Sequence, residues 1–179
     1  METENESQEK ITIYGILLGS KIFVDSQDGS KWLRDRGYGD GETKIVLMPY
    51  EALYLASIGR LVVTDRHNKG ISFEELFTRL RKKEKSLWLQ YLITRDLRNR
   101  GYVVKDGFGL GIDFNIHDRG DYPQKPSKYL VVGMSEGSPI KANALIELLR
   151  RAQANRKMLI LAVIDRRSEV VYYEISKLH

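Results

Sequence analysis

The sequence predicts an α/β protein made of two small mixed α/β domains. Its 179 residues fit one ordinary domain or two small ones, and an apolar fraction of 42% is enough for a real core. Short apolar runs typical of strands alternate with amphipathic runs typical of helices. The charged run RLRKKEK at 79–85 is the expected boundary, so the predicted units are residues 11–84 and 85–179.

The first unit opens with two predicted strands in 11–26, which meet at the turn Gly19-Ser20. Residues 30–42, SKWLRDRGYGDGE, are rich in glycine and charge and are interpreted as a connection. A helix is expected over 48–59, because Pro49 suits a first helical turn and Gly59 a helix end.

A short strand is expected at 60–65, followed by a helix that begins at Ser72. Ser72 and Glu75 have the spacing of a capping box, in which each side chain bonds the other residue's backbone N–H. The run 79–85 is interpreted as the solvated end of this helix rather than as a nucleic-acid-binding patch.

The second unit is predicted to have the element order α-β-β-β-α-β-β. Its first helix ends at Gly101, and its second has Ser138 as N-cap and Pro139 at the first helical position. The loop 119–128 holds two of the four prolines and cannot continue a strand. The expected segments are the helices 86–101 and 138–157 and the strands 102–107, 111–118, 129–134, 158–165 and 170–176.

The positive charge is concentrated in the second unit. Residues 1–84 carry 13 Lys and Arg against 14 Asp and Glu, whereas residues 85–179 carry 16 against 10. A basic excess in one domain is what a polyanion-binding protein requires, although a merely solvated surface gives the same count.

Several classes of protein are excluded or disfavoured. No apolar run approaches the length of about 18 residues that a membrane span needs. Residues 1–10 are acidic and polar, unlike a targeting peptide, and are predicted to be a disordered tail. The absence of cysteine excludes disulfides and Cys-ligated zinc and suits a cytoplasmic protein. The three histidines lack ligand spacing, so no metal and no other cofactor is expected.

Residues 107–111 form a glycine-rich segment. GFGLG at 107–111 superficially suggests a phosphate-binding loop, but it lacks the G-x-G-x-x-G spacing, and no helix follows it. The Walker lysine and hydroxyl pair is also missing. The segment is therefore interpreted as a hairpin turn.

A longer pattern consists of DLRNRGYVVK at 96–105, Gly107, GIDF at 111–114, YLV at 129–131 and RRAQANRKMLILAVID at 150–165. This pattern resembles the tRNA-splicing endonuclease family of archaea and eukaryotes. The segments YEALYLASIG and ISFEEL of the first unit also match archaeal members. The resemblance extends over nearly the whole chain, in order and at matching spacing.

The resemblance implies a two-domain α/β protein whose C-terminal domain has a nuclease-like central sheet flanked by helices. It also implies membership of a four-unit assembly that cuts precursor tRNA at a bulge-helix-bulge structure without a metal. A ribose 2′-hydroxyl attacks the adjacent phosphate, which leaves a 2′,3′-cyclic phosphate and a 5′-hydroxyl. The reaction needs a base, an acid and a cation, and the family assigns these tasks to Tyr, His and Lys.

Only one of the three family residues is present. The lysine matches Lys157, the tyrosine position holds His117, and the histidine position holds Pro126. Proline has no titratable group, whereas an imidazole with a pKa near 6.5 can act as acid or base. A site that uses His117 would still need a second proton-transfer group, such as Tyr122 or Lys125.

The resemblance also implies RNA-binding and subunit-interface residues. Arg150 matches a family arginine that reaches toward the RNA bulge, and Arg151 and Arg156 would add phosphate-attracting charge. An exposed helix arginine is the alternative interpretation of Arg150. The expected subunit contacts are the last strand and the turn before it, including Asp165, Glu169, Val171 and Tyr173, although Arg166 and Arg167 dilute the acidity of that turn.

Three hypotheses follow. The first is a structural, RNA-positioning subunit that joins a catalytic endonuclease chain in a heterotetramer. The second is a self-sufficient homo-oligomeric endonuclease with a rearranged site that uses His117 and Lys157. The third is an RNA-binding protein of this family without an endonuclease partner.

Overall fold

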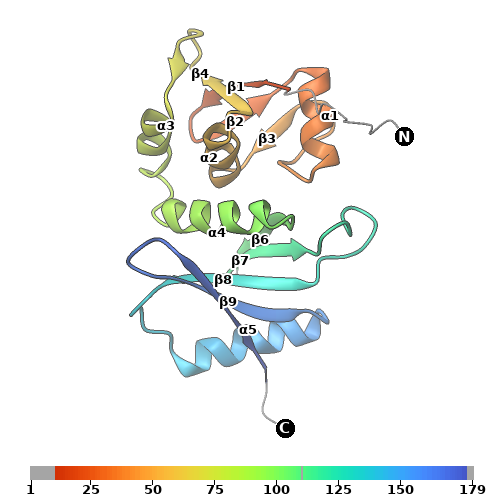
Figure 1. Ribbon diagram of the computed structural model, residues 1–179, viewed down its shortest axis with the longest axis vertical. Coiled ribbons are helices and arrows are strands. Elements are labelled where there is room, and N and C mark those ends of the chain that lie inside the picture. The colour runs from red at the N-terminus through yellow and green to blue at the C-terminus, as the bar shows by residue number, and fades with distance from the viewer. Residues whose placement is uncertain (1–10, 110, 177–179) are drawn as a thin grey trace, which may run out of the picture.

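The computed structural model describes residues 11–109 and 111–176 and contains two five-stranded sheets and five helices. It confirms the expected α/β class, with mixed sheets in both halves. In Figure 1 the first half of the chain lies above helix α4 and the second half below it. The prediction for residues 1–10 lies outside the described residues, and the boundary near residue 85 stays a prediction.

The first sheet has the strand order β3-β2-β1-β4-β5. Only β1 and β4 run parallel, and the other neighbouring strands are antiparallel. The elements of this half are β1 (Ile13–Leu18), β2 (Lys21–Val24), α1 (Gln27–Asp35), β3 (Ile45–Leu47), α2 (Pro49–Ser57), β4 (Leu61–Thr64), β5 (Gly70–Ile71) and α3 (Phe73–Leu80).

The second sheet has the strand order β10-β9-β8-β7-β6, with β8 and β9 parallel. A parallel pair needs a crossover, and α5 supplies it. The element order is the predicted α-β-β-β-α-β-β, made of α4 (Leu87–Asn99), β6 (Val103–Gly109), β7 (Ile112–His117), β8 (Tyr129–Ser135), α5 (Ala142–Ala154), β9 (Met158–Ile164) and β10 (Val170–Ile175).

Two helices cover the two faces of the second sheet (Figure 1). Helix α4 packs on the upper face and also against α2, and one buried cluster continues through both halves of the chain. Helix α5 covers the opposite face through a smaller cluster of Leu130, Leu148, Ala152 and Leu159. The sheet is therefore held between two helical layers, which fixes the strand ends that form the site below.

Two expectations about helices were wrong. Residues 27–35, partly assigned to a connection, form α1, which buries Gly29, Ser30 and Leu33. Helix α5 begins at Ala142 with Lys141 as N-cap, not at Ser138. The N–H of Ser138 bonds the carbonyl of Ser135 in a turn instead, and residues 136–144 are exposed without an apolar anchor.

The helix starts predicted at Pro49 and Ser72 were correct, whereas the capping box expected at Ser72 is formed on one side only among the described contacts. Pro49 is the first residue of α2, and Oγ of Ser72 accepts a hydrogen bond from the backbone N–H of Glu75. The Glu75 carboxylate pairs with Arg79 on the next turn. None of the helices within the described residues is long and apolar enough to cross a membrane.

Candidate functional site

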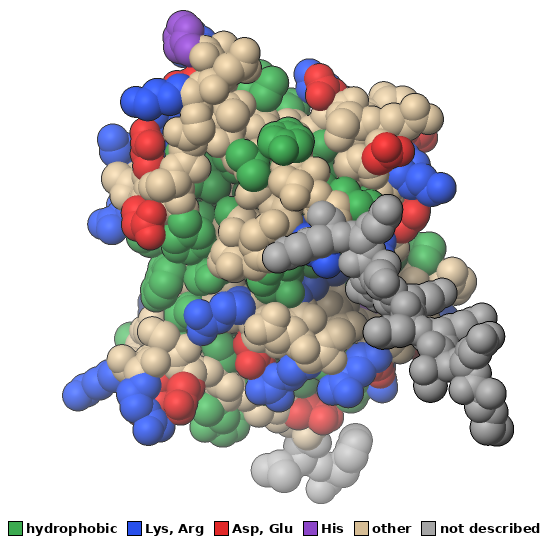
Figure 2. Space-filling view, turned by 45° about the horizontal axis from the view of Figure 1, so that its top comes forward, with side chains coloured by type: hydrophobic (Ala, Val, Ile, Leu, Met, Phe, Trp, Pro, Cys, Tyr) green, Lys and Arg blue, Asp and Glu red, His purple; other side chains and the backbone are tan. Residues whose placement is uncertain are grey.

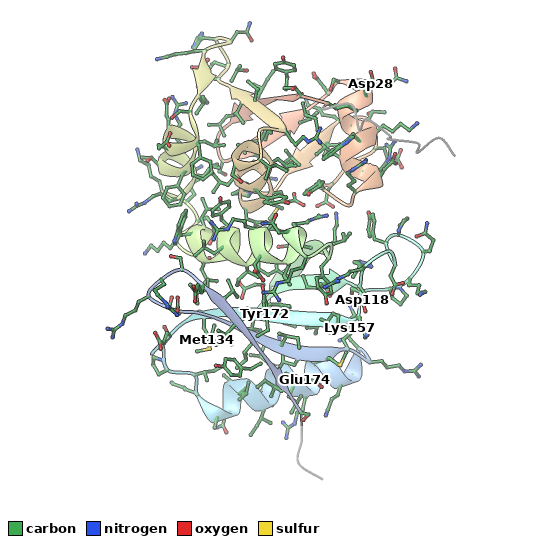
Figure 3. All side chains as sticks on the ribbon, viewed as in Figure 1. Asp28, Asp118, Met134, Lys157, Tyr172 and Glu174 are labelled. Atoms are coloured by element: carbon green, nitrogen blue, oxygen red, sulfur yellow. The ribbon has the colours of Figure 1, made fainter. Side chains whose placement is uncertain are left out.

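A pocket of about 590 Å³ opens where the end of β7, the loop 118–128 and the start of β9 meet. Figure 3 shows Lys157 and Asp118 at this end of the second sheet. The pocket is lined by Lys105, Gly107, Gly109, Ile112, Asn115, His117, Tyr122, Ser127, Leu130, Arg151, Asn155 and Lys157.

Lys157 reaches the pocket through a tight turn between α5 and β9. Arg156 has a positive φ of 55°, and the N–H of Lys157 bonds the carbonyl of Ala152 at 2.9 Å. The ammonium Nζ donates to Oδ1 of Asn115 at 2.9 Å and to Oγ of Ser127. Both acceptors are neutral, so they orient the lysine without cancelling its charge.

Burial lowers the pKa of Lys157 from the ordinary lysine value. A cation held by neutral acceptors at the rim of a pocket suits an incoming phosphate.

His117 is the last residue of β7, and its ring is held from two sides. Nδ1 lies 3.0 Å from the carbonyl oxygen of Lys125, and the ring meets Tyr122 edge-on, with centroids 5.1 Å apart and an interplanar angle of 86°. A carbonyl can only accept, so Nδ1 carries the proton of this bond. In the neutral imidazole Nε2 is then unprotonated.

The electrostatics of the pocket disfavour a charged imidazole. Burial lowers the pKa of His117, and the positive charges of Lys157 and Lys105 lower it further, against the hydrogen bond to Lys125. None of the described lining residues is acidic. The pocket thus favours the neutral form of His117.

The three arginines predicted to bind RNA lie at different places. Arg151 lines the pocket, whereas Arg150 and Arg156 are not among the lining residues. Arg150 is exposed on α5 and forms an ion pair with Glu147 at 2.6 Å. Arg156 is exposed in the turn before Lys157.

Pro126 lies exposed in the loop 118–128 and does not line the pocket. Its neighbours Lys125 and Ser127 contact the two candidate site residues, His117 and Lys157. The loop therefore brings the position of Pro126 next to the pocket, but the proline ring offers no proton-transfer group there.

The residues expected at a subunit interface lie on β10 and on the turn before it. Val171 and Tyr173 are 47% and 53% exposed. Asp165 accepts hydrogen bonds from the N–H groups of Arg167 and Glu169, and the Arg167 side chain forms ion pairs with both carboxylates. The acidic turn is thus largely neutralised within itself.

Sequence reasoning missed Asn115, Ser127 and Asn155. Asn115 lies two residues before His117 on one strand, so the period-two rule places both side chains on the same face. That signal was available for Asn115. The contact of Ser127 with Lys157 joins residues 30 positions apart and has no local sequence signal.

Comparison with known proteins places the chain in a family. Residues 13–77 match the N-terminal domain of tRNA intron endonuclease, and residues 87–172 match its catalytic C-terminal domain. The chain is similar to the tRNA-splicing endonuclease of Methanococcus vannielii, with 35% identity over 96% of this chain and 98% of that protein. The corresponding protein of Thermococcus onnurineus is 36% identical over 89% and 93% of the two chains, and that of Saccharolobus islandicus 28% over 92% and 97%. The chain therefore belongs to the tRNA intron endonuclease family.

Proposed function

We propose that this chain is a structural, RNA-positioning subunit of a tRNA-splicing endonuclease. It joins a catalytic chain in a heterotetramer that cuts precursor tRNA at bulge-helix-bulge junctions. The products carry a 2′,3′-cyclic phosphate and a 5′-hydroxyl. The observation that carries the proposal is the composition of the pocket, which holds Lys157 and His117 but no acidic side chain among its described lining residues. Pro126, which the resemblance matches to the family histidine, lies beside the pocket and offers no proton-transfer group.

The cleavage reaction needs two proton transfers on opposite sides of the phosphate, one from the 2′-hydroxyl and one to the departing 5′ oxygen. A single neutral His117 can accept a proton but cannot at the same time supply one. Lys157 can hold a phosphate without moving a proton. The pocket thus retains the phosphate-binding part of the chemistry and lacks half of the proton-transfer part.

Retention of Lys157 and Arg151 in a pocket without acidic lining residues supports a continuing role in RNA binding. The exposed side chains of Val171 and Tyr173 support assembly with another chain, because apolar residues on a terminal strand are commonly covered. Neither observation requires this chain to cut RNA.

A second candidate function is a self-sufficient endonuclease with a rearranged site. The arrangement at His117 favours it, because protonated Nδ1 bonds the Lys125 carbonyl and leaves Nε2 available as a base. Tyr122 lies against the same ring and would have to act as the acid. In this alternative the chain assembles with itself and needs no second gene product.

The test is cleavage of a bulge-helix-bulge RNA in EDTA by three preparations. These are the purified chain, a catalytic family member from the same organism that keeps Tyr and His at both positions, and their mixture. The proposal predicts cleavage that requires the catalytic chain and is increased by this chain. Cleavage by this chain alone, lost in His117→Ala, would establish the alternative instead.

A further inference from the structure

A second cluster of aromatic and basic side chains lies away from the pocket, between the end of α3 and the start of α4. Phe77, Arg81, Lys85 and Trp88 line a shallow depression of about 490 Å³. It shares no lining residue with the pocket around Lys157. The four lining residues, together with Lys82 and Lys83, are called the α3–α4 patch below.

Trp88 is exposed but held in a fixed position. Its ring lies 5.4 Å from that of Phe77, nearly edge-on, and 5.3 Å from that of Tyr91. Tyr91 is buried, so the indole is supported from the core side while 44% of the residue remains exposed. A large aromatic ring that is immobilised before binding loses little conformational entropy when a ligand stacks on it.

Four cations lie in the segment just before Trp88, and two of them, Arg81 and Lys85, line the same depression. Arg81, Lys82, Lys83 and Lys85 are all exposed, and none forms an ion pair with an acidic side chain in the part of the chain that the structure describes. Arg81 lies over the Phe77 ring at 5.7 Å. The one acidic residue of the run, Glu84, accepts a hydrogen bond from the hydroxyl of Ser86.

A solvated helix end explains only part of this arrangement. Basic residues are favoured at the C-terminus of α3 by the helix dipole, which accounts for Arg81 and its neighbours. It does not account for a half-exposed tryptophan in the same depression. Packing alone explains Phe77 and Tyr91, but it would not leave the indole open to solvent.

An exposed ring that shares a depression with unpaired cations is complementary to a nucleotide. Single-stranded nucleic acids are held by aromatic side chains that stack on bases and by cations that attract the phosphates. Protein interfaces are also enriched in aromatic residues and arginine, but they are depleted in lysine, so the lysines of this run favour a nucleic acid. The lining here is two aromatic rings and two cations.

We propose that the α3–α4 patch binds unpaired nucleotides of an RNA, by stacking a base on Trp88 and holding phosphates with Arg81 and Lys85. With respect to precursor tRNA the inference rests on the proposed function. The patch lies at the first turn of α4, and Arg98 and Asn99 at the other end of that helix are about 16 Å away along its axis. Because the patch shares no lining residue with the pocket around Lys157, it would contact other nucleotides than those held there.

Figure 2 shows Lys and Arg side chains, with acidic ones between them, along its left edge, the side on which α3 lies in Figure 1. It also shows them over the lower part of the molecule, where the second half of the chain lies. An RNA strand that contacts both the pocket around Lys157 and the α3–α4 patch would meet basic side chains at each of the two sites.

The experiment measures the binding of two RNAs to the full-length chain by fluorescence anisotropy. One is a 12-nucleotide single strand without secondary structure, and the other is a bulge-helix-bulge RNA with a single-stranded extension. The variants are Trp88→Ala, Trp88→Phe and the double variant Arg81→Gln/Lys85→Gln. The matched control is Lys21→Gln/Lys31→Gln, which removes two exposed lysines of the first half.

Trp88→Ala is expected to weaken binding of the single strand about five- to hundredfold, and Trp88→Phe much less, because any aromatic face can stack. Arg81→Gln/Lys85→Gln should reduce the slope of log K against log salt by roughly 0.7 per removed phosphate contact. The lysine control should bind like the wild type. Circular dichroism and thermal unfolding of each variant verify that it is folded.

The two RNAs separate this inference from the proposed function. Trp88-dependent binding of the single strand, without any effect of the chain on splicing cleavage, would support the patch and refute the splicing role. Wild-type affinity of Trp88→Ala for both RNAs would overturn the patch. Failure of the wild type to bind the single strand would also overturn the proposal. If Trp88→Ala lost only its association with the catalytic chain and kept its RNA binding, the patch would be a protein-docking surface instead.

Discussion

The ammonium Nζ of Lys157 donates a hydrogen bond to Oδ1 of Asn115 across 2.9 Å, and this contact joins the start of β9 to the middle of β7. Strand β8 lies between the two in the sheet, so the bond spans two strand spacings. It sets the position of Lys157, which we propose corresponds to the catalytic lysine of the family. The amide is neutral, and the bond therefore directs the lysine while leaving its charge available to an anion.

Removal of this bond should affect stability and RNA binding together. Asn115→Ala is expected to lower the free energy of unfolding by about 1 kcal/mol and to weaken RNA binding several-fold, because Lys157 then keeps only Ser127 as a partner. A double-mutant cycle with Lys157→Met, measured by urea unfolding, should give a coupling energy of about 1 kcal/mol. Strictly additive effects would show that the contact has no energetic role.

The lowered pKa of His117 predicts a pH dependence of stability. Because the folded protein disfavours the charged imidazole, the unfolded chain binds this proton more readily. The contribution of the neutral His117 to the free energy of unfolding is fully present above the pKa of the unfolded chain, about 6.5. It is lost as the pH falls through the lower pKa of the folded protein. Urea unfolding between pH 8 and 5 should show that the free energy of unfolding decreases more steeply with falling pH for the wild type than for His117→Gln. Equal slopes would contradict a lowered pKa.

Arg98 should connect α4 to the first half of the chain. Its guanidinium donates to the carbonyls of Arg36, Gly37 and Val104 and lies 3.8 Å from the centroid of the Tyr38 ring. A lysine cannot make the same set of bonds, because its ammonium is a point rather than a planar fork. Arg98→Lys is expected to lower the free energy of unfolding by about 2 kcal/mol in chemical denaturation.

Arg95→Lys is the matched control for that prediction. Arg95 lies on the same helix, and its one described contact is with the ring of Tyr91 at 5.6 Å. It should change stability by less than about 0.5 kcal/mol. Similar losses in the two variants would mean that the carbonyl bonds of Arg98 add nothing specific.

The exposed face of β10 should mediate assembly. Val171→Asp and Tyr173→Asp place a carboxylate on this face and are expected to reduce the mass of the assembly measured by light scattering, with or without the catalytic chain. Val62→Asp is the control, since Val62 is also an exposed strand valine, 41% against 47% for Val171. An assembly that is sensitive to Val62 and insensitive to β10 would place the interface on the first sheet.

Local signals in the sequence predicted most of the second half. Its seven elements follow the expected order, because segments with the apolar spacing of strands (period two) are clearly separated there from segments with the apolar spacing of helices (period 3.6). The first half was harder to predict. The glycines and charges of residues 30–42 indicated a connection, yet α1 begins at Gln27 and packs on the sheet. A Cβ at Gly29 would lie 2.4 Å from Oγ of Ser26 and 3.3 Å from side-chain atoms of Ile13 and Val24. The glycine allows α1 to approach the sheet closely, and a sequence alone does not show that approach.

The sequence predicted several residues of the candidate site but not how they are arranged in space. A resemblance to a family assigned Lys157, His117 and Pro126 to the site, but the partners of Lys157 come from residues 30 and 42 positions away. The run 79–85 received only a solvated-end interpretation, because the exposure of Trp88 depends on how α3 and α4 pack. Contacts between distant segments decide both features.

The most direct test of the central claim is single-turnover cleavage of a bulge-helix-bulge RNA in EDTA by the wild-type chain and by His117→Tyr/Pro126→His, each without a partner. We expect no cleavage by the wild type. We expect cleavage by the double variant with 2′,3′-cyclic phosphate products, since each restored proton-transfer group contributes about 10²- to 10⁴-fold. Cleavage by the wild-type chain at a rate equal to or above that of the double variant would contradict the claim that His117 and Pro126 have removed the catalytic function.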